Sequence, residues 1–148
     1  MRRLNLTTIL LFLSCLSALP IGAALAQTIV VHKTPTCGCC NGWVDYLRDE
    51  GFDVITHNHD ELSAIKAQAG LTDQRLMSCH TALIDGYVVE GHVPANDIRR
   101  LISEQPDVLG ITAPGMPQLS PGMGSRTPKD YNVLSFGKNG EIELFSMY

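Results

Sequence analysis

Three cysteines lie within four residues of one another in the segment Thr36-Cys37-Gly38-Cys39-Cys40. Cys37 and Cys40 have the C-x-x-C spacing found in dithiol redox sites and in metal sites, and Cys39 adds a third sulfur between them. Thiolates are soft ligands, so three of them on one loop favour a soft ion of low coordination number. The segment therefore predicts a Cu(I) site, with zinc as the less favoured alternative.

Two other interpretations of the same cysteines remain open. In a thiol–disulfide oxidoreductase, Cys37 would attack a substrate disulfide and Cys40 would resolve the mixed disulfide. In a structural role, Cys37 and Cys40 would form a plain disulfide and Cys39 would be incidental. Metal binding and redox chemistry can also coexist, because thiolate-bound Cu(I) can exchange electrons with Cu(II) or with a disulfide. The spacing favours the metal site first, the redox dithiol second and the structural disulfide last.

The first 26 residues have the features of an export signal. Two arginines follow Met1, an apolar run extends from residue 4 to 25, and Ala24-Leu25-Ala26 is a small-x-small cleavage motif. The unbroken part of the run, 4–19, is shorter than the roughly 20 residues that a membrane-spanning helix needs, which disfavours an uncleaved anchor. We therefore expect cleavage near Ala26, a metal-binding domain at 27–148 and a periplasmic location.

The predicted mature chain is acidic. Removing Arg2 and Arg3 leaves 9 of the 11 basic residues against 15 acidic residues. This balance disfavours nucleic acid as a partner, because phosphates are bound by lysine and arginine. A second membrane-spanning segment is not evident in the sequence, so we expect no membrane association after cleavage. The expected partners are copper ions and other periplasmic copper-handling proteins.

The apolar pattern predicts alternating strands and helices that place the cysteines at the edge of a sheet. Strands are expected at 28–32, 52–56, 81–84, 87–90, 133–136 and 141–145, with hairpin turns at Asp85-Gly86 and Asn139-Gly140. Helices are expected from about Cys37 to Gly51, from a cap at Asp60 to Gly70, and after Pro94, whereas the Pro- and Gly-rich segment 106–128 is expected to be a loop. This order indicates an α/β mixed sheet with helices on both faces and the cysteines in its first strand–helix turn.

Three stretches of the chain resemble the CopG-type periplasmic family, which is associated with copper resistance. They are TPTCGCC at 34–40, SCHTA at 78–82 followed by GYVVEGHVPA at 86–95, and APGMP at 113–117 followed by SPGM at 120–123. Together they extend the resemblance over nearly all of the predicted mature chain. The resemblance implies a thioredoxin-like domain with a C-terminal Pro/Gly/Met loop and hairpin. It also implies a cysteine site able to hold several copper ions and a copper oxidoreductase activity.

The thioredoxin-like alignment places Cys79 and His80 where a thioredoxin has a cis-proline before its third strand. Proline offers no ligand atom, whereas cysteine and histidine offer two. The alignment therefore predicts that this turn faces Cys37 and supplies Cys79 as a fourth sulfur ligand. His80 is expected either to bind the metal through a ring nitrogen or to hold Cys79 in position without binding the metal itself. The alternatives for Cys79 are a buried apolar cysteine or a disulfide with one of the other three.

Met116 and Met123 occur in two Pro-Gly-Met units seven residues apart. A thioether is a good Cu(I) donor and needs no deprotonation, so both methionines are candidate ligands on a loop that can cover the cysteines. The alternative is that they only cover the surface of the domain.

The remaining histidines are weaker candidates. His32 ends the first predicted strand, and His92 follows the predicted hairpin, but neither position fixes where the side chain points. His57 and His59 have the spacing of a metal pair, yet a solvated turn at the end of the second strand is the preferred interpretation. The sequence as a whole predicts a periplasmic protein that sequesters copper and oxidises or reduces it. A thiol–disulfide oxidoreductase is the alternative, and a metallochaperone without redox chemistry is a third possibility.

Overall fold

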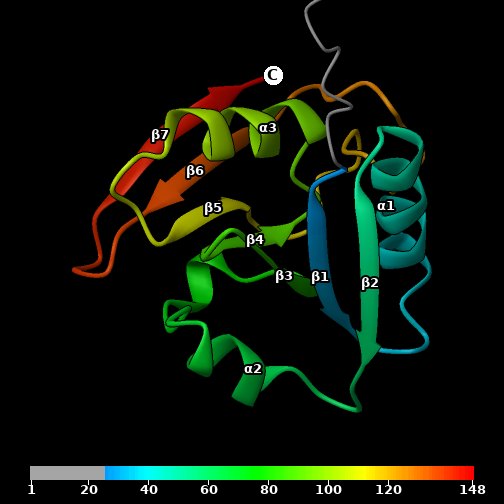
Figure 1. Ribbon diagram of the computed structural model, residues 1–148, viewed down its shortest axis with the longest axis horizontal. Helices are drawn as coiled ribbons and strands as arrows, with labels where there is room; N and C mark the ends of the chain where they lie inside the picture. Colours follow the sequence, from blue (N-terminus) through cyan, green and yellow to red (C-terminus); the bar gives the residue numbers. More distant parts are fainter. Residues whose placement is uncertain (1–25) are drawn as a thin grey trace, which may run out of the picture.

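The computed structural model describes residues 26–148, and the predicted signal segment lies outside them except for its last residue. The described chain forms seven strands, three α-helices and one short 3-10 helix (Figure 1). The strands are β1 (Thr28–Lys33), β2 (Asp53–Asn58), β3 (His80–Ile84), β4 (Tyr87–Gly91), β5 (Gly110–Ala113), β6 (Asn132–Phe136) and β7 (Ile142–Met147). The helices are α1 (Gly38–Asp49), α2 (Ser63–Gln68), α3 (Ala95–Glu104) and the 3-10 helix η1 (Gln74–Leu76). Within residues 26–148, every helix is too short or too polar to cross a membrane.

All seven strands belong to one mixed sheet in the order β2-β1-β3-β4-β5-β6-β7. The pairs β1–β2 and β4–β5 are parallel, and the other neighbours are antiparallel. Because β1 and β3 are adjacent and antiparallel, the end of β1 is next to the start of β3. The topology therefore brings the loop after β1, which carries three cysteines, beside the turn before β3, which carries the fourth.

The two faces of the sheet bury different apolar clusters. The larger cluster joins α1 and α3 to one face and includes the fully buried residues Trp43, Leu47, Ile98 and Leu101. The smaller cluster lies beside η1 on the other face. Val88 and Val89 are neighbours in β4 but belong to different clusters, as the alternation of a strand requires. Helices therefore lie on both faces, and α1 is fixed on the sheet with its first turn at the edge that carries the cysteines.

One part of the predicted loop 106–128 is a strand. The segment Gly110–Ala113 is fully buried as β5, parallel to β4 and antiparallel to β6. Gly110 suggests a loop in the sequence, but the position needs glycine because a Cβ there would lie 2.1 Å from the carbonyl oxygen of Val88. The β6–β7 hairpin is thereby joined to the central sheet through β5.

The predicted cap of the second helix was wrong. Helix α2 begins at Ser63 after Leu62, which makes no side-chain capping bond, and Asp60 lies outside the helix. The reason is that the pairing with β1 continues past β2, since the backbone N–H of His59 donates to the carbonyl of Lys33 at 2.9 Å. The helix therefore begins later in the chain than the predicted cap at Asp60 would place it.

Candidate metal centre

The first turn of α1 carries three of the four cysteines. Cys37 is the N-cap, and its sulfur accepts a hydrogen bond from the backbone N–H of Cys40 at 3.3 Å. Cys37 and Cys40 are joined by a disulfide, with their Cα atoms 5.3 Å apart. The free N–H groups and the dipole of a helix N-terminus favour negative charge there, so they favour the thiolates that reduction of this disulfide releases.

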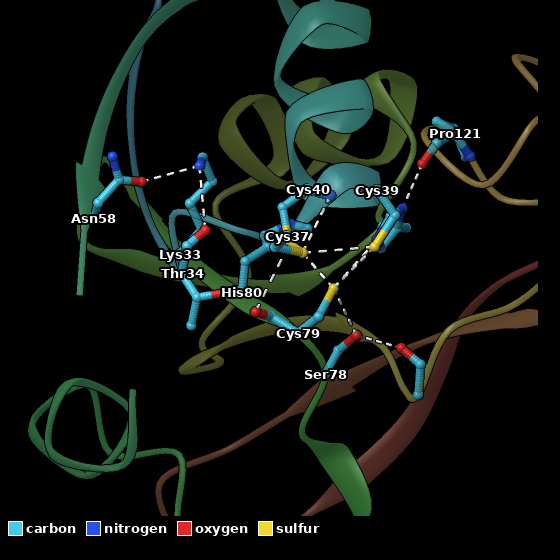
Figure 2. Close-up of a disulfide and its surroundings, with 12 residues drawn as sticks. Lys33, Thr34, Cys37, Cys39, Cys40, Asn58, Ser78, Cys79, His80 and Pro121 are labelled. Atoms are coloured by element: carbon cyan, nitrogen blue, oxygen red, sulfur yellow. Dashed lines mark hydrogen bonds between the residues drawn. A yellow bond between two sulfur atoms is a disulfide. The ribbon is translucent and has the colours of Figure 1, made fainter. Parts of the chain in front are cut away.

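Cys79 lies opposite this turn, as the thioredoxin-like alignment predicts. The Sγ atom of Cys39 is 3.6 Å from that of Cys37 and 4.0 Å from that of Cys79 (Figure 2). The four cysteine sulfurs all lie within 4.8 Å of one another, although they come from two turns about 40 residues apart in the chain. The structure thus brings all four predicted sulfur donors into one cluster, in which Cys39 and Cys79 are free thiols.

Burial raises the pKa of the Cys79 thiol to about 11, and the neighbouring Cys39 adds to the effect. The Ser78 hydroxyl, 3.9 Å from the Cys79 sulfur, acts in the opposite direction. Cys79 is therefore protonated at neutral pH without metal. Metal binding must displace this proton, because the thiolate and not the thiol is the ligand.

Two buried histidines flank the Cys79 sulfur. The Nδ1 atom of His80 lies 3.5 Å from it, and the Nε2 atom of His92 lies 3.3 Å from it. Cys79, His80 and His92 form a second group whose ligand atoms lie within 4.8 Å of one another. Cys79 thus belongs both to the sulfur cluster and to a group with two imidazoles.

His92 lies closer to the cysteine cluster than the sequence indicated. Its Nδ1 lies 2.6 Å from the carbonyl oxygen of Pro121, which can only accept, so Nδ1 carries the proton. Nε2 is then unprotonated in the neutral ring and faces the Cys79 sulfur, where it can accept the thiol proton or bind a metal. The position of His92 just after β4 was the available signal, but only the tertiary contact with Pro121 sets the ring's orientation.

His80 is completely buried beneath the cluster. Its ring packs against Trp43, with the centroids 4.3 Å apart, and its Nε2 has no hydrogen-bond partner in the described part of the chain. Burial is the main cause that holds the pKa of His80 well below its usual value, and the nearby His92 ring contributes. His80 is therefore neutral at physiological pH, which is the state in which an imidazole binds a metal.

A buried polar network holds the turn that carries Cys79. The carboxylate of Glu90 accepts hydrogen bonds from the backbone N–H of Ser78 at 2.6 Å and from the hydroxyl of Thr81 at 2.7 Å. The ammonium of Lys66 is 2.5 Å from Glu90 and 2.9 Å from the Thr81 hydroxyl. These residues lie on both sides of Cys79 and His80 in the sequence, so the network fixes the turn from α2 and β4.

The loop 114–123 joins the two cysteine-bearing turns. Near its start, the backbone N–H of Gly115 donates to Met77 at 3.2 Å and the Ser78 hydroxyl donates to the Gly115 carbonyl. Near its end, Gly122 has a φ of +89°, and a Cβ there would lie 2.7 Å from the Cys39 carbonyl oxygen and 3.0 Å from Nδ1 of His92. The loop is therefore fitted closely against the cluster at both ends.

The predicted methionine ligands lie on this loop. Met116 follows the first anchored glycine and is 54% exposed, whereas Met123 follows the second and is half-buried. Their role as ligands remains a prediction. His32, His57 and His59 form a separate group on β1 and the end of β2, outside the cysteine cluster.

Known proteins resemble this chain in sequence and in structure. Two solved structures of a copper resistance protein, CopG, in Form 1 and Form 2, are each 40% identical in sequence with a TM-score of 0.76. In both cases the match covers 83% of this chain and 98% of the other. A family model described as a protein of unknown function, DUF411, matches residues 76–123, which include the Cys79 turn and the loop 114–123. The search of curated proteins found no match.

Proposed function

The chain belongs to the CopG family of copper resistance proteins, and from this premise we propose that it captures Cu(I) in the periplasm through Cys37, Cys39, Cys40 and Cys79. The observation that carries the proposal is the convergence of four sulfurs within 4.8 Å from two separate turns. Two sulfurs bound to one metal at about 2.3 Å lie roughly 3.8–4.0 Å apart in tetrahedral or trigonal geometry. The separations of 3.6 and 4.0 Å around Cys39 are close to this range.

Copper is the ion that this donor set favours. Four thiolates are soft ligands, and neutral imidazoles complete a shell that is suited to copper more than to magnesium or calcium. Thiolates can also bridge two ions, so the reduced cluster holds more than one Cu(I). We place His80 and the thioethers of Met116 and Met123 at the edge of this shell, where donors that need no deprotonation add Cu(I) affinity without adding charge.

The Cys37–Cys40 pair supplies the redox chemistry. Oxidation of the two thiolates to the disulfide releases two electrons, which reduce two Cu(II) ions to two Cu(I) ions. In the reverse direction two Cu(I) ions reduce the disulfide and become two Cu(II) ions. Because Cu(II) is less suited to thiolate than Cu(I) is, oxidation of the copper favours its release from the site. Reduction of the copper favours its capture.

We further propose that the domain is thioredoxin-like and that the chain is exported and cleaved near Ala26. The parallel β1–β2 pair, the antiparallel β3–β4 pair and a C-x-x-C motif at the start of α1 support a thioredoxin-like unit. Strands β5, β6 and β7 extend the sheet beyond this unit.

Anaerobic titration of the reduced protein with Cu(I), in competition with a chromophoric Cu(I) chelator, tests the proposal. We expect more than one Cu(I) per chain, and fewer in the variants Cys39→Ser and Cys79→Ser. A reduced and folded protein that takes no Cu(I) from the chelator would overturn the proposal. An insulin-reduction assay tests the alternative function, because a thiol–disulfide oxidoreductase would work without metal and would tolerate Cys39→Ser.

A further inference from the structure

A second group of histidines lies on the ladder between β1 and β2. His32 and His57 are direct partners in the parallel register, and His59 follows two residues after His57 in a chain that is still paired with β1. Directly paired residues share a face of the sheet, and so do residues two apart in an extended strand. The backbone register therefore projects all three imidazoles from one face.

This face is not the one that carries the cysteine-site histidines. In the antiparallel β1–β3 pair, Lys33 is opposite His80 and His32 is opposite Thr81. Because neighbouring residues of a strand point to opposite faces, His32 points away from the face that carries His80. Lys33 lies on the same face as His80, opposite to that of His32, and its ammonium donates to Asn58 at 2.9 Å and to the carbonyl of Thr34 at 3.3 Å. The three imidazoles thus form a site of their own.

The ring of His32 is in contact with each of the other two rings. The Nδ1 atom of His32 lies 2.9 Å from the Nε2 atom of His59, and the ring of His32 stacks on that of His57 with the centroids 5.4 Å apart. Two imidazole nitrogens bound at right angles to one metal at 2.0–2.1 Å lie about 2.9 Å apart. His57 is exposed and His59 is half-buried, so both rings can adjust while the strands hold their backbones.

We propose that His32, His57 and His59 form a binding site for Cu(II), independent of the cysteine cluster. Imidazole nitrogen suits copper, zinc and nickel, and a set of three histidines is an established donor set for a divalent first-row ion. Among these ions Cu(II) binds nitrogen donors most tightly. The protein then has a soft thiolate site and a nitrogen site at the same end of β1, each matched to a different oxidation state of copper.

Titration of tag-free Cys39→Ser/Cys79→Ser protein with Cu(II), followed by EPR spectroscopy, tests the site. The Cys37–Cys40 disulfide remains intact in this variant, so the described residues contain no free thiol. We expect one tightly bound Cu(II) per chain, with hyperfine structure from nitrogen ligands. Adding His57→Ala and His59→Ala should weaken Cu(II) binding by more than the roughly 10- to 100-fold that loss of a partner outside the ligand set costs.

Asn58→Ser is the matched control, because Asn58 lies between the two substituted histidines but contacts Lys33 on the other face. This variant should bind Cu(II) as the parent does. The His57→Ala/His59→Ala change in the reduced wild-type background should leave Cu(I) loading unaltered, which separates this inference from the proposed function. Equal Cu(II) affinity with and without His57 and His59, or the absence of a nitrogen-coordinated Cu(II) signal in the parent, would refute the site.

Discussion

Replacing Lys66 by methionine should destabilise the protein in a way that depends on pH. The side chain of Lys66 is 8% exposed and that of its partner Glu90 is 0% exposed. The substitution keeps most of the apolar length of the side chain but removes the ammonium, which leaves the Glu90 carboxylate buried without its counter-charge. Breaking a buried ion pair in this way costs about 3–5 kcal/mol of unfolding free energy.

The pH dependence follows from the carboxyl group. Burial raises the pKa of Glu90, and the ammonium of Lys66 is the main influence that opposes this rise. Without Lys66 the pKa rises further, so the folded state binds a proton that the unfolded state, with a pKa of about 4.3, releases. The destabilisation is therefore small at and below about pH 4.3. The destabilisation grows by about 1.4 kcal/mol per pH unit until the pH reaches the raised pKa of the buried Glu90 carboxyl, and above that pH it stays constant.

Urea unfolding of the metal-free disulfide form, measured between pH 4.5 and pH 8, tests this reasoning. Arg75→Met is the matched control, because Arg75 forms an exposed pair with Asp73 and its loss should leave the pH profile unchanged. The network also holds the Ser78 N–H beside Cys79, so Lys66→Met should weaken Cu(I) binding even at pH values where the variant is fully folded. A Lys66→Met variant with a constant and small loss of stability across this range would show that the pair is screened by water.

Three further predictions concern the site. Gly122→Ala should cost more than about 1 kcal/mol of unfolding free energy and weaken Cu(I) binding in a chelator competition, because it combines a positive φ with a backbone clash. Gly124→Ala has the positive φ without a close contact, so it should leave Cu(I) affinity unchanged. Below pH 6.5 the metal-free protein should lose up to about 1.4 kcal/mol per pH unit through His80, because its lowered pKa lets the unfolded state bind the proton first. His80→Asn should flatten that slope in urea unfolding. Alkylation of Cys79 by iodoacetamide at pH 7, measured in the Cys39→Ser variant by mass spectrometry, should be several-fold slower than that of an exposed cysteine, because burial is the largest cause of its raised pKa and remains in this variant.

The parts of the fold with strong local signals could be predicted from the sequence. The turn Asp85-Gly86 has positive φ at both residues, 48° and 83°, which is the backbone that this dipeptide favours in a tight hairpin. The start of α1 at Gly38 and its end before Gly51 also follow from residues next to the boundary. Strand β5 could not be predicted in this way, because the glycine that suggested a loop is required by the close approach of Val88.

The candidate site could also be predicted from the sequence only in part. The cysteine cluster could be predicted because three of the cysteines are close together in the sequence and the thioredoxin-like alignment placed Cys79 in the turn that faces Cys37. His92 could not be ranked, because its orientation depends on the Pro121 carbonyl, 29 residues later in the chain.

His32, His57 and His59 show most directly what the sequence alone could not predict. Taken singly, His32 and the His57–His59 pair each have an ordinary explanation at the end of a strand. Their contact depends on the parallel register that pairs His32 with His57, and a slip of one residue would turn one of the two side chains to the opposite face. That register is held by the burial of Ile29, Val31 and Val54 on the other face, so the apolar core under α1 determines whether these imidazoles can share an ion.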